Sequence, residues 1–221
     1  MLHFREELEE LQSKLLEMGG LVEAAIHNSI YALVERDEDH AKEVMWGEAQ
    51  INQKEIEIDE LATRLLALFQ PMARDLRFLT AVIKMNSDLE RMGDLAVNIT
   101  ERALTLMKEP VLRPLVDIPR MAELSESMVR RSLDAFARRD ADLARDVLLA
   151  DDEVDRLRDA VYDELLTFMQ EERSTINRAV ALMFIAQNLE RIADHATNIA
   201  EDVLFLVKGI DVRHHAETRE S

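Results

Sequence analysis

The chain has 221 residues, enough for one large domain or two small ones, and 48% of them are hydrophobic. No stretch reaches the ~18 uninterrupted apolar residues of a membrane span, and the N-terminal Met-Leu-His-Phe-Arg-Glu-Glu lacks the features of a secretory signal. The absence of cysteine excludes disulfides, iron–sulfur clusters and thiolate zinc sites. A net charge of −18 disfavours nucleic acid and anionic lipid as partners and favours cations and basic protein surfaces.

The spacing of apolar residues predicts an all-α protein. These residues recur at intervals of three and four almost throughout, and only five glycines and four prolines interrupt the chain. Asp37 and Asp140 each precede a helical pattern and are predicted to be N-caps. Six helices are predicted, over residues 3–35, 37–69, 74–107, 119–138, 140–170 and 174–208.

The prolines divide the chain into two halves. Three of the four lie at positions 110, 114 and 119, which predicts a linker between two groups of three helices. Long helices joined by short turns favour two tandem antiparallel three-helix bundles placed end to end. The predicted parts are a first bundle, a linker, a second bundle and a polar tail, over residues 1–109, 110–119, 120–210 and 211–221.

An internal repeat supports this division. Residues 89–101 read LERMGDLAVNITE and residues 189–201 read LERIADHATNIAE, with eight of thirteen positions identical at an offset of one hundred. The ends of the first helices, residues 32–37 and 135–140, match less closely at an offset of 103. We therefore predict a three-residue slip between the halves, inside the second helix of each bundle.

The repeat preserves a stripe of acidic side chains. Glu90, Asp94, Asn98 and Glu101 fall within about 80° of one another around a helix, away from the apolar side. Equivalent residues follow in the second half at 190, 194, 198 and 201. The second helix of each bundle has a matching stripe, formed by Glu48, Asn52, Glu55 and Asp59 in the first half and by Asp151, Asp155 and Asp159 in the second.

Folding each pair of helices back on itself gathers these stripes. If the first pair turns near residue 72, Glu90 lies level with Glu55, and Asp94 lies level with the segment from Glu48 to Asn52. A turn near residue 172 places Glu190 near Asp155 and Asp194 near Asp151.

Oxygen ligands in such numbers suit magnesium, calcium, manganese or iron, and also zinc. In the alternative reading the stripes are solvated surfaces, with Arg91 and Arg191 pairing with Asp94 and Asp194. The register of the second helix stays open, because Glu55 matches Asp155 in one register and Arg158 in the other.

The same residues carry a resemblance to a known family. The segments QPMARDLR at 70–77 and DLERMGD at 88–94, with a second copy ERIAD at 190–194, resemble the signature of the PhoU family of phosphate-uptake regulators. The resemblance implies two three-helix bundles related by a pseudo-twofold axis. It also implies multinuclear metal clusters of iron, manganese, zinc or magnesium, held by pairs of acidic motifs. The matching pairs are Glu55–Asp59 with Glu90–Asp94, and Asp155–Asp159 with Glu190–Asp194.

The resemblance further implies a cytoplasmic adaptor that signals phosphate sufficiency. The implied partners are the ATPase subunit of the phosphate ABC transporter, the phosphate-responsive sensor histidine kinase and a second copy of the chain. Association with the inner face of the membrane would come through these partners. A metal-free helical scaffold is the first alternative. A carboxylate-bridged di-metal enzyme is disfavoured because the chain lacks the Glu-x-x-His motifs of such enzymes.

Three local features of the sequence do not follow from the repeat. The first half has QPMARD at its second turn where the second half has QEERST, so any role of that turn is confined to the first half. His195 replaces Leu95 beside an acidic stripe, where it is a solvated residue or an additional ligand, and we favour a solvated residue. Trp46 and Met45 are exposed contact residues or helix-packing residues, and we favour packing.

Overall fold

The computed structural model describes residues 2–112 and 117–209, and every regular element among them is helical. Each of the six predicted helices is present, with ends within three residues of those predicted. The all-α prediction is therefore confirmed. The elements are α1 (Leu2–Glu35), α2 (Glu38–Phe69), α3 (Ala73–Leu106), α4 (Asp117–Arg138), α5 (Ala141–Glu171), the short 3-10 turn η1 (Arg173–Thr175) and α6 (Ile176–Lys208). The predicted polar tail, residues 211–221, and residues 113–116 of the predicted linker lie outside the described residues.

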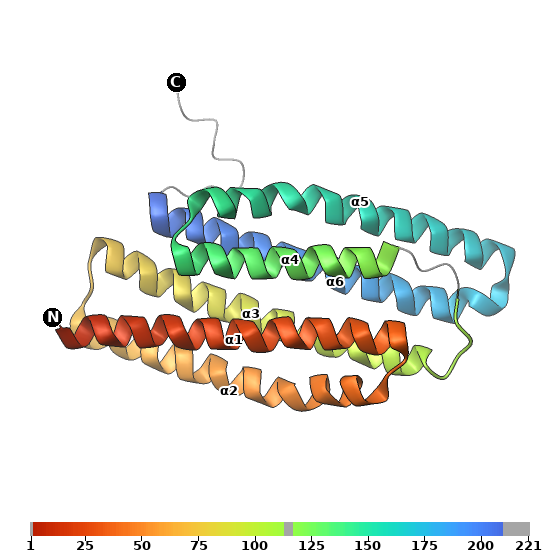
Figure 1. Cartoon of the computed structure of the whole chain (residues 1–221), viewed down its shortest axis with the longest axis horizontal. Helices are drawn as coiled ribbons and strands as arrows, with labels where there is room; N and C mark the ends of the chain where they lie inside the picture. The colour runs from red at the N-terminus through yellow and green to blue at the C-terminus, as the bar shows by residue number, and fades with distance from the viewer. Residues whose placement is uncertain (1, 113–116, 210–221) are drawn as a thin grey trace, which may run out of the picture.

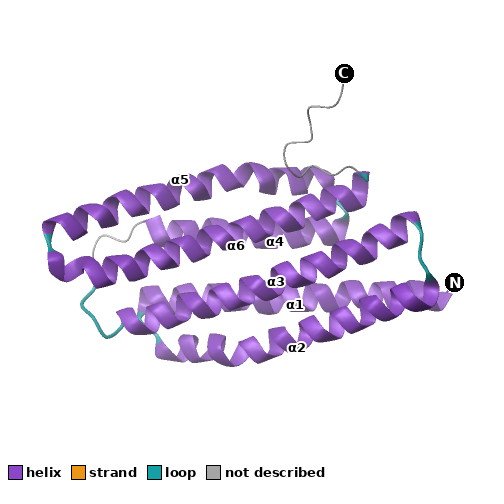
Figure 2. Ribbon diagram, turned by 180° about the vertical axis from the view of Figure 1, so that it is seen from behind, coloured by secondary structure: helices purple, strands orange, loops and turns teal. Residues whose placement is uncertain are grey.

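Three helices from each half form an antiparallel bundle, and the two bundles lie side by side (Figures 1 and 2). Contacts between the bundles run along α3 and α6 and between α1 and α4. The predicted end-to-end placement is wrong. Neighbouring positions of α3, such as Leu95 and Ala96, are both buried because this helix packs against its own bundle and against α6 together.

Polar side chains join α3 to α6 across this interface. The Lys84 ammonium lies 3.0 Å from Asp202, and His195 Nδ1 lies 2.7 Å from Asp88 Oδ1, which also accepts a hydrogen bond from Asn198. Only 11% of the His195 side chain is exposed. The favoured interpretation of His195 as a solvated residue is therefore wrong, because α6 turns this position towards α3.

The repeat is visible in the turns after the first helix of each bundle. Arg36 and Arg139 both adopt left-handed backbone conformations, with φ of 55° and 56°. The next residues, Asp37 and Asp140, accept hydrogen bonds from the backbone amides two and three positions later. Both are N-caps, as predicted.

The three-residue slip lies in a turn and not inside the second helix. The buried residues of α2 recur in α5 at an offset of 103, whereas those of α3 and α6 match at an offset of one hundred. Gln70, Pro71 and Met72 separate α2 from α3, but only Glu172 separates α5 from η1. A slip inside a packed helix would rotate its apolar face away from the core, and a turn accommodates it without that cost. The matching buried pairs are Ala41 with Ala144, Val44 with Val147, Ile51 with Val154, Ile58 with Val161, and Ala62 with Leu165.

One apolar side chain is exposed against expectation. Trp46 on α2 is 72% exposed, so the packing role favoured for it is wrong. Its equivalent on α5, at the offset of 103, is Leu149, which is 76% exposed. Both positions lie on helix faces directed away from the core.

Candidate metal centre

A first group of carboxylates lies where α2 and α3 pack together. Gly93 of α3 lies so close to Ile51 of α2 that an added Cβ would be 3.1 Å from the Ile51 side chain. About two helical turns closer to the start of α3, the side-chain amide nitrogen of Asn86 donates hydrogen bonds to the backbone oxygen of Glu55 and to Asp59 Oδ1, both at 2.9 Å. These contacts fix the register in which α2 and α3 lie against each other, and it agrees with a fold-back near residue 72.

The carboxylates of this group influence one another. Burial raises the pKa of Glu55, and the negative charges of Asp59 and Asp94 raise it further. Burial likewise raises the pKa of Glu90, with added contributions from Asp94 and Glu55. We call Glu55, Asp59, Glu90 and Asp94 the first carboxylate cluster. Its members repel one another, and a cation would relieve that repulsion.

A second carboxylate cluster lies between α5 and α6 and consists of Asp151, Asp155, Glu190 and Asp194. Burial together with the charges of Asp194 and Asp155 raises the pKa of Asp151 to about 6. The pKa values of Glu190 and Asp194 are also raised, mainly by burial and then by the charge of a neighbouring aspartate. The structure thus brings Asp151 and Asp155 near Glu190 and Asp194, at the level given by the sequence argument.

The second cluster already contains a positive charge. The Arg158 guanidinium lies 2.5 Å from Glu190, 3.3 Å from Asp155 and 3.0 Å from Asp159. We call the alignment in which the buried residues of α2 and α5 match, at an offset of 103, the packing register. In this register Arg158 is the counterpart of Glu55. The repeat therefore places a carboxylate in the first cluster where it places a guanidinium in the second.

Two of the ten predicted ligands differ from the rest. Asp159 is directed to Arg158, and 69% of its side chain is exposed. Glu48 is half-buried and forms no ion pair or hydrogen bond with any residue in the described part of the chain. At the same offset, its counterpart on α5 is Asp151. The register that the sequence leaves open is the one with an offset of 103, in which Asp159 is equivalent to Ile56 and not to Asp59.

The donor atoms are carboxylate oxygens, which fit hard cations. Within residues 2–112 and 117–209, no three His, Asp or Glu side chains are positioned to hold one ion together. Holding an ion would require the carboxylates of a cluster to rotate towards a common point. The first cluster fits a cation better than the second, because no arginine or lysine in the described ranges forms an ion pair with its carboxylates, whereas Arg158 pairs with Asp155 and Glu190 in the second. The charge of Arg91 lowers the pKa of Glu90 without such a pair.

Asn86 and Arg158 organise the clusters and were not among the predicted site residues. Asn86 is fully buried on the apolar side of α3, and a polar side chain in such a position is a signal for a structural hydrogen bond. Arg158 could have been recognised only by choosing the other of the two registers. Sequence spacing alone does not favour either one.

Comparison with known proteins follows the same division of the chain. The PhoU domain model matches residues 15–103 and 118–203, and so covers both bundles. The chain belongs to the PhoU family. A phosphate-specific transport system accessory protein PhoU homolog from Pseudomonas putida is 45% identical over 212 residues, which are 96% of this chain and 83% of the relative.

Solved PhoU structures have the same fold. The crystal structure of PhoU from Pseudomonas aeruginosa superposes with a TM-score of 0.91 at 43% identity, and the match covers 94% of this chain and all of the other. The phosphate transport system regulatory protein PhoU from Streptococcus pneumoniae gives a TM-score of 0.88 at 32% identity, over 95% and 99% of the two chains. No helix in the described ranges is long and apolar enough to cross a membrane.

Proposed function

We propose that this chain is a regulatory adaptor of phosphate transport that signals phosphate sufficiency inside the cell. Its PhoU relatives are named as accessory and regulatory proteins of the phosphate transport system, and they match the chain over almost its full length. The proposed partners are the ATPase subunit of the phosphate ABC transporter and the phosphate-responsive sensor histidine kinase. A net charge of −18 suits basic faces on such partners.

We further propose that the carboxylate clusters bind metal ions while the chain acts in the cytoplasm as a homodimer. The observation that supports metal binding is the convergence of Glu55, Asp59, Glu90 and Asp94. The pKa of both glutamates is raised, first by burial and then by the negative charges of their neighbours. Iron, manganese, zinc and magnesium all accept such oxygen ligands. A bound ion would supply positive charge and so neutralise the cluster.

The residues of the chain have separate tasks in this proposal. Asn86 holds Asp59 by a hydrogen bond and so limits the directions in which that carboxylate points. Glu90 and Asp94 lie one turn apart on α3 and face the same way. None of these roles involves a reaction, and we propose that the protein has no catalytic activity.

A metal-free scaffold is the second candidate, and Arg158 favours it. This arginine neutralises part of the second cluster without any ion, through contacts with Asp155 and Glu190. Under this alternative the acidic stripes are docking surfaces for basic partners. Elemental analysis of the purified protein distinguishes the two candidates.

A reporter of a phosphate-starvation promoter tests the regulatory role. Cells that lack this gene should express the reporter in phosphate-rich medium, and the restored gene should repress it again. In the same cells, affinity capture of the chain should recover the transporter ATPase or the histidine kinase. Equal reporter output with and without the gene, in rich and in poor medium, would remove the proposal.

A further inference from the structure

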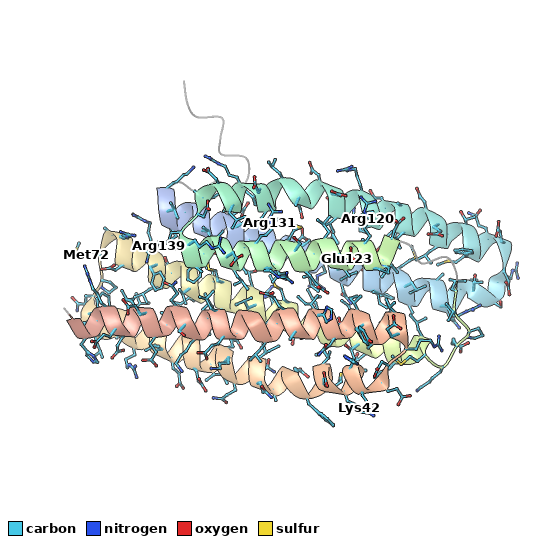
Figure 3. All side chains as sticks on the ribbon, in the orientation of Figure 1. Lys42, Met72, Arg120, Glu123, Arg131 and Arg139 are labelled. Carbon is cyan, nitrogen blue, oxygen red and sulfur yellow. The ribbon has the colours of Figure 1, made fainter. Side chains whose placement is uncertain are left out.

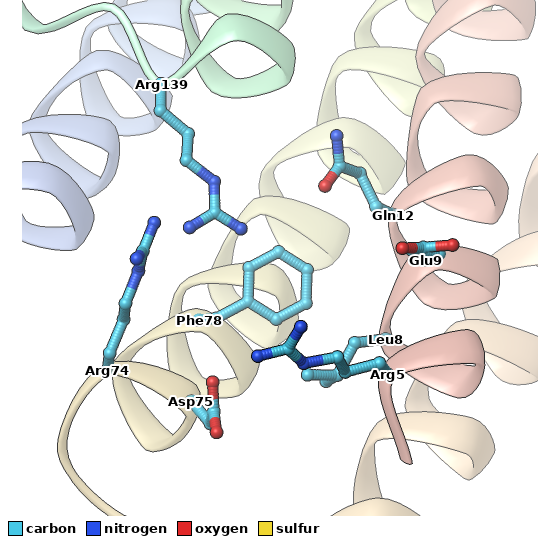
Figure 4. Close-up of a pocket in the computed structure, with 8 residues that line it drawn as sticks. All are labelled: Arg5, Leu8, Glu9, Gln12, Arg74, Asp75, Phe78 and Arg139. Carbon is cyan, nitrogen blue, oxygen red and sulfur yellow. The ribbon is translucent and has the colours of Figure 1, made fainter. Parts of the chain in front are cut away.

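A cleft lined by arginines opens between the two bundles (Figure 4). It lies at the end of the molecule where α3 begins and α4 ends, which Met72 and Arg139 mark in Figure 3. Its volume is about 560 Å³. Arg5 reaches it from α1, Arg74 from α3 and Arg139 from the turn after α4, and Figure 4 shows their side chains gathered around Phe78. A smaller adjoining hollow shares Arg74 and Arg139 and adds Arg77. We call these four residues the arginine cleft.

Among the residues that the structure describes, the guanidinium groups of the arginine cleft have no acidic partner at ion-pair distance. Across residues 2–112 and 117–209, no carboxylate oxygen lies within 4.0 Å of any of them, and Nε of Arg77 is buried without a hydrogen bond. Other arginines of this acidic chain do form ion pairs, as Arg64 does with Glu7 and Arg120 with Glu153. The cleft therefore keeps several donors available at one place.

The opposite end of the molecule shows that the fold does not need these free donors. Arg36 is the repeat counterpart of Arg139 and has the same left-handed backbone, but its guanidinium donates to the backbone oxygens of Met107 and Glu109. At the offset of one hundred, the positions of Arg74 and Arg77 are taken by serine and asparagine. The arginine cleft is thus a feature of one end only, where the repeat has been altered.

The cleft concentrates positive charge in a protein that is strongly negative. Burial lowers the pKa of Arg139, and the positive charge of Arg74 lowers it further. Glu9 and Asp75 also line the cleft, and neither forms an ion pair with an arginine in the described ranges. The charge of Asp75 opposes the lowering of the Arg139 pKa. Phe78 lies under Arg139, with its ring centre 5.9 Å from the guanidinium carbon, and supports that side chain from below. An anion between the arginines would relieve their repulsion.

We propose that the arginine cleft binds a phosphate group. Guanidinium groups present paired donors that match the oxygens of phosphate, and here they approach from three separate elements. A tetrahedral anion can accept from several directions at once, whereas a carboxylate offers two oxygens in one plane. The cleft lies within the volume range of small-molecule sites. Inorganic phosphate and a small organic phosphate share the chemistry that would be recognised.

The choice of phosphate among oxyanions rests on the proposed function, but the site itself rests on the geometry. Binding is measured by isothermal titration calorimetry of the full chain in phosphate-free buffer at low salt. The two probes are inorganic phosphate and glycerol 3-phosphate. Low salt is needed because exposed charge interactions are screened as ionic strength rises.

The decisive variant is Arg74→Gln with Arg139→Gln, and its matched control is Arg64→Gln with Arg120→Gln. Both double variants change the net charge equally, but the control removes arginines that lie outside the cleft in exposed ion pairs. We expect the cleft variant to bind about tenfold or more weakly, because charged hydrogen bonds are lost, and the control to bind like the wild type. The pair Arg74→Lys with Arg139→Lys keeps the charge and should give intermediate affinity, even where the glutamine variant unfolds.

The outcomes separate the possible ligands. Binding of inorganic phosphate that depends on the cleft identifies free phosphate, and the same pattern for glycerol 3-phosphate alone identifies an organic phosphate. If neither probe binds to the wild-type protein, or if both double variants lose binding equally, the proposal is overturned. Such a failure would leave the regulatory role intact, since the reporter experiment measures that role without reference to this cleft.

Discussion

The pKa of Asp151 links the second carboxylate cluster to the stability of the fold. Its pKa is raised to about 6 from 3.8 by burial and by neighbouring aspartates, so its carboxyl holds a proton more tightly in the folded than in the unfolded protein. A raised pKa favours the folded state at low pH, and this contribution is lost as the pH rises through about 6. Glu55, Glu90, Glu190 and Asp194 add to the effect in the same direction.

We therefore expect the metal-free protein to become more stable when the pH falls from about 7.5 to about 5.5, with Tm rising by roughly 2–4 °C. Circular dichroism during heating measures this change. Asp151→Asn should reduce the pH dependence, and Asp163→Asn, at an exposed position of α5 outside the cluster, should not. If the Tm of the wild-type protein falls when the pH is lowered over this range, the raised pKa values of the cluster do not control its stability.

Sequence spacing predicts which acidic residues share a helix face, because the helical period is fixed. The structure accordingly brings Glu90 and Asp94 together with Glu55, as the fold-back argument expects. Spacing does not predict which carboxylates are neutralised by the protein itself. Arg158 reaches three acidic residues because its side chain is long, and its role depends on a register that the sequence leaves open.

At the scale of helices, the contact between α2 and α3 is controlled by Gly93. An added Cβ there would lie 3.1 Å and 3.2 Å from two side-chain atoms of Ile51, whereas at Gly47 of α2 it would meet nothing within 4 Å. Gly47→Ala should raise the free energy of unfolding by about 0.5–1 kcal/mol, because alanine favours the helix. Gly93→Ala should not show this increase, because overpacking against Ile51 offsets it and lowers the free energy of unfolding by about a further 1–2 kcal/mol.

Urea unfolding of the two variants measures the difference under identical conditions. Since both substitutions replace a helical glycine by alanine, propensity cancels and only the contact with Ile51 remains. Equal stability of the two proteins would mean that α2 and α3 separate without cost. The register that forms the first cluster would then be poorly defined.

Helix ends are predictable from sequence where a residue has a clear capping role. Asp37 and Asp140 mark the starts of α2 and α5 because their side chains bond the free amides that follow. The position of the three-residue slip is not predictable from the two matched segments, residues 32–37 and 89–101, because the slip lies between them. It falls at Gln70, Pro71 and Met72, in the turn that precedes the arginine cleft.

At the scale of the whole molecule, the placement of the bundles decides which surfaces remain free. Periodicity predicts six helices but does not predict that α3 and α6 pack against each other. An apolar helix face indicates burial, but it does not indicate which other helix covers it. The interface leaves only 11% of the His195 side chain and 15% of the Asp88 side chain exposed. It leaves both carboxylate clusters on outer faces, formed separately by α2 with α3 and by α5 with α6.

The metal content of the full chain, purified without chelators, decides whether the carboxylate clusters bind metal ions. Elemental analysis should find iron, manganese, zinc or magnesium in stoichiometric amount. Glu90→Ala with Asp94→Ala should lower that amount without changing the helical circular dichroism signal. The control Glu123→Ala with Asp163→Ala, at exposed positions outside both clusters, should keep the wild-type content. A wild-type protein that contains no metal and binds none on titration would show that the clusters are not metal sites.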